Sequence, residues 1–212
     1  MIELVEKFVR SSKTGIFTFG DALSMAGYRR EAVRMALTRA VKAGDIKRVR
    51  RGLYCLSSEL SPVLPHPYVL SNLVYGPSYI SMETALEFHG WIPEAVHNVF
   101  AITNARGRRF LTPFGLFRYE TIKQSPLMSG VERYENDPSG TFFVASPLKA
   151  LCDMVVARNL DWRGIEPLEE SLRIEREYLE RLSISDFRQL ENVYYSKKAA
   201  QFLIGLKKEL GL

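Results

Sequence analysis

Residues 29–56, RREAVRMALTRAVKAGDIKRVRRGLYCL, decide the fold of the N-terminal part of this chain. From Arg29 to Ala43 the apolar side chains recur at helical spacing, and Gly44 suits the left-handed conformation that ends a helix. Two short runs rich in β-forming residues follow, one on each side of Arg50-Arg51-Gly52. The segment therefore predicts a helix and then a β-hairpin whose tip carries arginines.

Upstream, the sequence predicts two more helices. Ile2, Val5, Phe8 and Val9 have helical spacing and indicate a helix over residues 2–11. Thr18 is expected to cap a second helix, which ends at Gly27, so that only Gly27 and Tyr28 join it to the third. Three helices with one tight turn, followed by a hairpin, are the order of a winged helix-turn-helix.

The third helix predicts a DNA-reading surface. Val33, Ala36, Leu37 and Ala40 share one face and are expected to pack inward. Long cationic side chains and one hydroxyl occupy the other face, and the hairpin adds more cations. Arginine can bond both major-groove acceptors of guanine, while neighbouring cations hold phosphates. The predicted DNA-binding residues are Arg29, Arg30, Arg34, Thr38, Arg39, Lys42, Lys47, Arg48, Arg50 and Arg51.

The net charge agrees with that surface. The chain of 212 residues carries +5, whereas residues 1–60 alone carry 12 basic and 6 acidic side chains. The whole basic excess therefore lies at the N-terminal end, which points to an anionic polymer as its partner. A merely solvated face and a protein-docking module are the alternatives. If a random duplex did not bind at low salt, or if replacing Arg34, Arg50 and Arg51 with alanine left binding unchanged, the prediction would be contradicted. True DNA binding should also weaken steeply with salt.

Several other classes of function are disfavoured. No run is long and apolar enough to cross a bilayer, and acids stand where a secretory signal needs bases, so we expect a cytoplasmic protein without membrane contact. Cys55 and Cys152 are expected to be reduced core residues. His66, His89 and His97 lack metal-ligand spacing, so we expect no metal. The sequence has no glycine-rich phosphate loop and no nucleophile elbow, so we also expect no cofactor and no enzymatic activity. A nuclease is the weaker alternative, since Asp45-Ile46-Lys47 and the pair Glu83 and Glu87 match half-sites only loosely.

The remainder of the chain predicts an α+β domain. Residues 58–67 are rich in proline and serine and are expected to link a first domain, residues 1–57, to a second, residues 68–212.

Within the second domain, Ser81 and Ser146 are expected to cap helices, and His97 is expected to lie within a strand. A row of leucines over 168–182 is either core or a dimer contact, and core is favoured. We expect strands at 96–103, 115–122, 131–135 and 141–145, and helices from Tyr68 to Val74, 82–89, from Pro147, 167–182 and 190–210.

Four segments carry a family resemblance. Residues 78–93, SYISMETALEFHGWIP, and residues 145–153, ASPLKALCD, resemble segments of the AbiEi antitoxins, although Leu148 stands where that family usually has glutamate. The strand pair between Thr103 and Tyr119 agrees in order, and residues 49–54 resemble the family's wing. The resemblance spans nearly the whole chain.

The resemblance implies a repressor and antitoxin of a type IV toxin–antitoxin system. The winged helix would bind inverted repeats in its own promoter, which leaves a homodimer on the DNA open. The C-terminal domain would counter a nucleotidyltransferase toxin without a stable complex, and this activity should survive deletion of residues 1–57. A transcription factor that responds to a small effector is the alternative.

Two groups of basic side chains stand out in the C-terminal part. They are ordinary solvated loops in one interpretation. In the other they form the antitoxin surface and contact nucleic acid or the toxin's RNA substrate. The groups are Arg106, Arg108 and Arg109, and Lys197 and Lys198.

Overall fold

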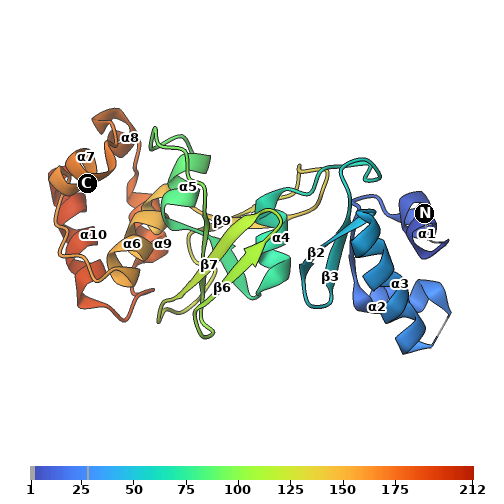
Figure 1. Ribbon diagram of the computed structural model, residues 1–212. Coiled ribbons are helices and arrows are strands. Elements are labelled where there is room, and N and C mark those ends of the chain that lie inside the picture. The colour runs from blue at the N-terminus through green and yellow to red at the C-terminus, as the bar shows by residue number, and fades with distance from the viewer. Residues whose placement is uncertain (1–2, 28) are drawn as a thin grey trace.

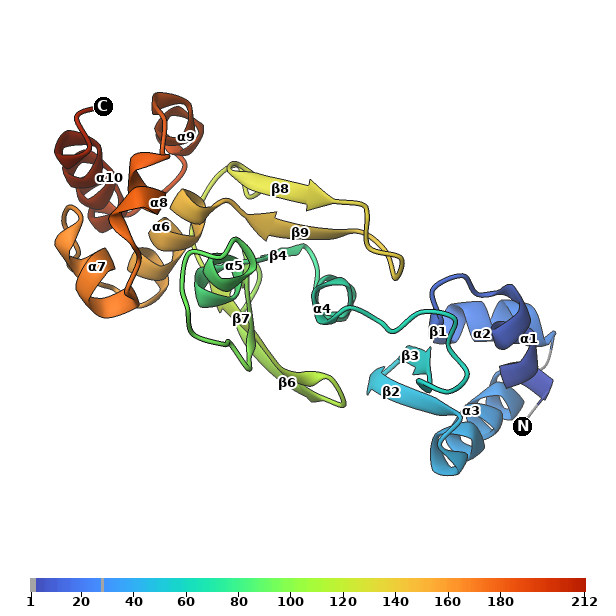
Figure 2. The ribbon, with the colours of Figure 1, turned by 90° about the horizontal axis from the view of Figure 1, so that it is seen from above.

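The computed structural model describes residues 3–27 and 29–212, so Ile2 of the predicted first helix and Tyr28 of the predicted turn lie outside the described residues. Figure 1 and Figure 2 show an elongated molecule. The N-terminal helices and a small sheet occupy one end, a larger sheet the middle, and a group of helices the C-terminal end. The described residues form a mixed α+β fold, as predicted.

Residues 3–56 form a winged helix. Its sheet has the order β1-β3-β2, and both pairs of strands are antiparallel. The predicted helices and hairpin are confirmed, while β1, which pairs Ile16 with Cys55, was not predicted as a strand. The elements are α1 Glu3–Ser11, β1 Ile16–Thr18, α2 Phe19–Ala26, α3 Arg30–Ala43, β2 Ile46–Arg50 and β3 Leu53–Leu56.

Local signals account for the helix ends. The Thr18 hydroxyl accepts a hydrogen bond from the amide of Asp21 at 3.1 Å, and the Asp21 carboxylate accepts one from the amide of Thr18 at 2.7 Å. This reciprocal pair satisfies amides that have no partner within the helix. Gly27 and Gly44 end α2 and α3 with φ angles of 62° and 82°, which residues with a Cβ rarely adopt. The predicted caps are confirmed.

The core of the winged helix lies between α1, α3 and the small sheet. Val33, Leu37 and Ala40 of α3 are buried there, and Ala36 packs against them from a partly buried position. The rings of Phe8 and Phe17 stack with their centroids 3.9 Å apart. The predicted inward face of α3 is therefore confirmed.

The hairpin of β2 and β3, here called the wing, packs on both of its faces. Ile46 and Leu56 belong to the N-terminal core, whereas Val49, Leu53 and Cys55 belong to the larger core of the C-terminal part. Adjacent residues of a strand point to opposite faces, so one short hairpin serves two cores. The wing thus fixes the position of the winged helix against the rest of the chain.

A mixed six-stranded sheet forms the middle of the molecule. The strand order is β6-β7-β5-β4-β9-β8, with β5–β7 and β4–β9 parallel and the other pairs antiparallel. Strand β6 is the edge nearest the wing (Figure 2). The elements are α4 Pro67–Val74, β4 Ser78–Ile80, α5 Met82–Phe88, β5 Val99–Thr103, β6 Arg108–Thr112, β7 Gly115–Thr121, β8 Val131–Tyr134 and β9 Phe142–Ala145.

The C-terminal helices differ from the two long ones predicted. A single helix over 167–182 is wrong: Arg173, with φ 54°, breaks it, and the turn brings Ile174 into the core at 1% exposure. A single helix over 190–210 is also wrong, because residues 191–196 separate two helices. Leu168 and Leu179 are fully buried, which confirms the core interpretation of the leucine row. The helices are α6 Pro147–Ala157, α7 Glu166–Leu172, α8 Arg176–Glu180, α9 Ile184–Leu190 and α10 Lys197–Glu209.

Two smaller predictions are also wrong. His97 is exposed and precedes β5 instead of lying within a strand. Ser81 stands at the start of α5, but its hydroxyl makes no capping bond and donates to Asp153 at 2.6 Å. The charged carboxylate strengthens this hydrogen bond and so holds the Ser81 hydroxyl toward Asp153. Ser146, in contrast, caps α6 as predicted by accepting a bond from the amide of Lys149.

A buried ion pair lies where the family-like segments meet. Lys149 and Asp153 are one turn apart in α6, are fully buried and lie 3.1 Å from each other. Lys149 also donates to Gln124 and to the Tyr194 hydroxyl. Burial raises the pKa of Tyr79 and of Tyr194, so both phenols stay protonated as donors. Asp153 accepts hydrogen bonds from three hydroxyls, those of Tyr79, Ser81 and Tyr194.

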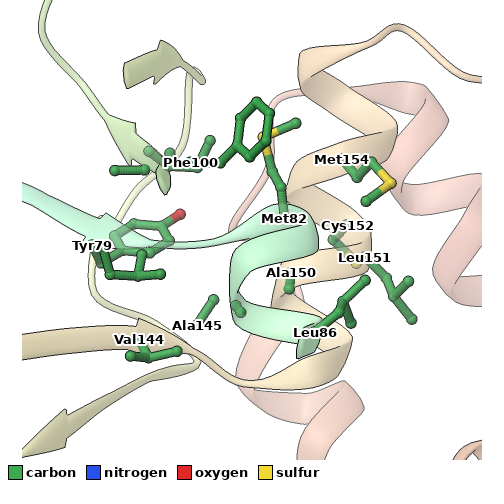
Figure 3. Close-up of a cluster of buried hydrophobic side chains, with 14 of the residues drawn as sticks. Tyr79, Met82, Leu86, Phe100, Val144, Ala145, Ala150, Leu151, Cys152 and Met154 are labelled. Atoms are coloured by element: carbon green, nitrogen blue, oxygen red, sulfur yellow. The ribbon is translucent and has the colours of Figure 1, made fainter. Parts of the chain in front are cut away.

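Apolar side chains surround this network. Figure 3 shows side chains of β4, α5, β5, β9 and α6 directed into one shared interior, with Leu86 of α5 facing α6. Two of the family-like segments, residues 78–93 and 145–153, each supply one side of that interior. The polar network therefore joins the sheet to α6 inside the core.

Candidate nucleic-acid interface

All ten predicted DNA-binding side chains are exposed. The outward face of α3 carries Arg34, whose side chain is 58% exposed and pairs with Glu31 at 3.3 Å. The Thr38 hydroxyl donates to the backbone carbonyl of Arg34 at 2.8 Å, and so still has lone pairs for another donor. These side chains are held on a rigid helix and can be presented to a base edge without rearrangement of the core.

Helix α3 and the wing enclose a hollow of about 600 Å³, here called the wing hollow. Four arginines and a hydroxyl from the two elements line it, and two aromatic rings complete its walls. The guanidinium of Arg30 lies 5.4 Å from the ring centroid of Phe19, which limits its motion. The lining residues are Arg30, Arg34, Thr38, Arg48 and Arg51, with Phe19, Gly52 and Tyr54.

A second hollow continues from the wing to the sheet. This wing–sheet groove has a volume of about 740 Å³ and lies between the wing, the end of α4 and edge strand β6. Arg48 and Arg51 line both hollows, so the two adjoin. The cations of the groove are Arg48, Arg50, Arg51, Arg108 and Arg109.

Specific contacts order the groove. Arg50 donates to the carbonyl of Leu73 in α4 at 3.4 Å. The guanidinium of Arg108 lies 5.4 Å from the ring centroid of Tyr75, and the Tyr75 and Phe110 rings are 5.9 Å apart. Five guanidinium groups along one groove create a strong positive potential, which attracts a phosphate backbone.

Some predicted residues do not join these hollows. Lys47 points to the opposite face of β2, where its ammonium lies 5.6 Å from the Phe114 ring centroid. Lys42 lines a smaller hollow that also contains Thr38 and Arg48. Arg29 and Arg39 are exposed and line neither the wing hollow nor the wing–sheet groove. The predicted cations that gather in the wing hollow therefore lie on the side of α3 that faces the wing.

The two C-terminal basic groups lie apart. Arg108 and Arg109 stand on β6 beside the wing, and the nearby backbone of Arg106 accepts a hydrogen bond from the Tyr75 hydroxyl. Lys197 and Lys198 begin α10 at the far end of the molecule (Figure 1). Lys198 is bound to Asp161 at 2.9 Å, so it serves a local ion pair. The predicted antitoxin surface is therefore not one continuous surface.

Sequence reasoning missed the junction of β6 with the wing. More than fifty residues of sequence separate the wing arginines from Arg108 and Arg109, and no local pattern predicts that they lie close together. Tyr75 and Phe110 are the aromatic residues between them, and the sequence pattern does not distinguish these two from ordinary core residues. Only the pairing of β6 at the sheet edge brings the groups together.

Comparison with known families supports this assignment of the N-terminal unit. Residues 3–57, about a quarter of the 212-residue chain, match the family described as transcriptional regulator, AbiEi antitoxin. The N-terminal unit is thus similar to the AbiEi antitoxin family. The predicted resemblance is therefore confirmed for residues 3–57, and the match supports a role in DNA-binding transcriptional regulation. No curated protein matches the chain.

The AbiEi antitoxins are a family of regulators and not of enzymes. Burial raises the pKa of Cys55 to about 11 and raises that of Cys152 further, so both thiols are protonated at neutral pH and poorly nucleophilic. Across residues 3–27 and 29–212, no three His, Cys, Asp or Glu side chains gather as metal ligands would. Within the same residues, no helix is long and apolar enough to span a membrane.

Proposed function

We propose that this AbiEi-family regulator binds inverted repeats in its own promoter as a repressor and counters a nucleotidyltransferase toxin. The observation that carries the repressor role is the wing hollow, in which α3 and the wing direct four arginines to one place. One unit, residues 1–57, would read the operator, residues 58–67 would connect it, and residues 68–212 would carry the antitoxin activity.

The proposed DNA interface divides into two parts. Arg34 and Thr38 of α3 would contact base edges in the major groove, because they stand on the helix that the winged helix inserts. Arg48 and Arg51 would hold the adjoining phosphates, and Arg108 and Arg109 would extend that contact along the DNA. Two copies on an inverted repeat would place two such interfaces on one duplex.

The dependence of binding on salt tests this extended interface. With five or six phosphates neutralised, the logarithm of the association constant should fall with the logarithm of salt with a slope of about −5. Arg108→Gln/Arg109→Gln should reduce the slope by about 2, because two phosphate contacts are lost. Fluorescence anisotropy with an operator duplex between 50 and 200 mM salt measures this.

The matched control is Arg176→Gln/Arg181→Gln, which removes the same charge at the other end of the molecule. Its slope should equal that of the wild type. An unchanged slope in the Arg108 and Arg109 variant would remove β6 from the proposed interface. Equal reductions in both variants would attribute the effect to net charge.

The antitoxin role is tested in growing cells. The neighbouring reading frame should encode a nucleotidyltransferase, and co-expression of the present chain should restore growth. Deletion of residues 1–57 is a poor test, because it removes Val49, Leu53 and Cys55 from the C-terminal core. Arg34→Ala/Arg51→Ala should instead restore growth fully under an independent promoter, since both residues lie on the surface of the winged helix.

Failure of the wild-type chain to restore growth would refute the antitoxin role and leave the repressor role intact. Failure of the Arg34 and Arg51 variant alone would mean that neutralisation uses the DNA-reading surface. Measurement of protein abundance in the same cells separates either outcome from degradation.

A further inference from the structure

A pocket of about 390 Å³ lies in the C-terminal part of the chain, outside the wing hollow. Side chains from β5, β6, β7 and the end of α6 meet there. Met82 and Phe100 are 2% and 9% exposed and form its inner wall. The charged lining residues are Arg109, Arg118, Glu120 and Arg158.

Two of the arginines are direct neighbours on adjacent strands. Arg109 of β6 and Arg118 of β7 are paired in the antiparallel register. Like charges directly opposite each other destabilise a sheet unless an anion lies between them. No acceptor among the described residues pairs with the Arg109 guanidinium, which remains available.

The third arginine completes a cluster around Phe100. The guanidinium groups of Arg118 and Arg158 lie 5.1 Å and 5.9 Å from the Phe100 ring centroid. Contact with an aromatic face orients a guanidinium and limits its motion. Three cations therefore reach one pocket from three different elements.

The acidic side chains nearby do not satisfy this cluster. Glu120 lies 3.5 Å from Arg118, a long contact, and Glu83 pairs with Arg158. Even so, Nε of Arg118 is buried without an acceptor among the described residues, and one carboxylate oxygen of Glu83 is buried without a donor. Buried polar groups normally have partners, and Arg118 lines the pocket, so its unpartnered Nε indicates that a ligand is missing.

We propose that this pocket binds a small ligand with a terminal phosphate group. Planar guanidinium groups bind phosphate oxygens in pairs, and a protonated phosphate oxygen or a ligand hydroxyl would donate to Glu120, the carboxylate that lines the pocket. The volume is within the range of small-ligand sites. Inorganic phosphate and a nucleoside monophosphate share this chemistry.

The pocket also adjoins the proposed DNA interface. Arg109 lines both the pocket and the wing–sheet groove. A phosphate held in the pocket would therefore engage a guanidinium that DNA could otherwise use. Arg118 and Arg158 line only the pocket, so its ligand can be tested independently of DNA binding.

Calorimetric titration of the full chain tests the proposal. Inorganic phosphate and adenosine 5′-monophosphate are titrated separately in chloride buffer of constant ionic strength, and at least one should bind with a stoichiometry of one. Binding of the nucleotide alone would identify a larger ligand than free phosphate. Arg118→Gln and Arg158→Gln should each weaken binding at least tenfold, because each removes one guanidinium group that would bind the phosphate. Arg176→Gln, which removes an exposed charge elsewhere, should bind as the wild type does.

A measurement on the wild type does not depend on the folding of any variant. With methyl-labelled methionine, whichever of the two compounds binds should shift the NMR signal of Met82, which lines the pocket, and leave those of Met25 and Met35 unchanged. No binding of either compound, or equal weakening by Arg176→Gln, would overturn the proposal. Binding of duplex DNA through Arg118 without binding of either small compound would overturn it as well. None of these results would affect the proposed repressor role.

Discussion

Replacing Arg34 and Arg51 together by alanine is expected to weaken operator binding by about 100- to 1000-fold. Arg34 stands on the base-reading face of α3 and Arg51 at the wing tip, and the two line one hollow. A base-reading arginine contributes about 1–3 kcal/mol, and a lost phosphate contact adds to this. Both side chains are exposed, so the core of the winged helix should remain intact.

Anisotropy titration of an operator duplex and of a scrambled duplex measures this effect. Arg34→Ala alone should reduce the preference for the operator, whereas Arg51→Ala alone should weaken binding to both duplexes similarly. The control Arg176→Ala/Arg181→Ala removes the same charge and should bind as the wild type does. Wild-type affinity in the Arg34 and Arg51 double variant would place the DNA elsewhere on the molecule.

Lys149→Met is expected to destabilise the chain by about 3–5 kcal/mol. The substitution leaves the Asp153 carboxylate buried without its cationic partner, and removal of one member of a buried pair has this effect. Urea unfolding, followed by circular dichroism, measures the loss. A similar loss is expected for Asp153→Leu, which leaves the Lys149 ammonium and three hydroxyl donors without their acceptor.

A double-mutant cycle separates the ion pair from simple packing. Lys149→Met/Asp153→Leu should lose less stability than the sum of the two single variants, because no uncompensated charge remains. The surface pair Arg181 and Glu177 is the matched control, and its loss should cost about 0.5 kcal/mol because water surrounds it. Strict additivity at Lys149 and Asp153 would show that the charges do not stabilise each other.

The winged helix could be predicted almost completely from local signals. Thr18 and Gly44 define helix ends through bonds and angles within a few residues of themselves, and the spacing of Val33 and Leu37 defines the inward face of α3. The same kind of reasoning failed at Arg173, where the backbone adopts a left-handed conformation although the residue is neither glycine nor proline. That turn is stabilised by burial of Ile174, a long-range gain that no local pattern records.

The site itself was only partly predictable. The exposed cations of α3 and the wing follow from helical and strand periodicity, since each period determines which side chains share a face. Lys47 nevertheless faces Phe114, because the C-terminal part covers that side of the wing. The joining of the wing arginines to Arg108 and Arg109 depends on strand pairing between distant segments.

The sequence alone determined the winged helix, its cationic face and the basic excess of the first sixty residues, because caps, periodicity and charge are local properties. Only the tertiary structure decided that the wing belongs to two cores, that Lys149 and Asp153 form a buried pair, and that Arg109, Arg118 and Arg158 line one pocket. Those features require contacts between residues far apart in the chain. Burial and strand pairing create such contacts only when the whole domain folds.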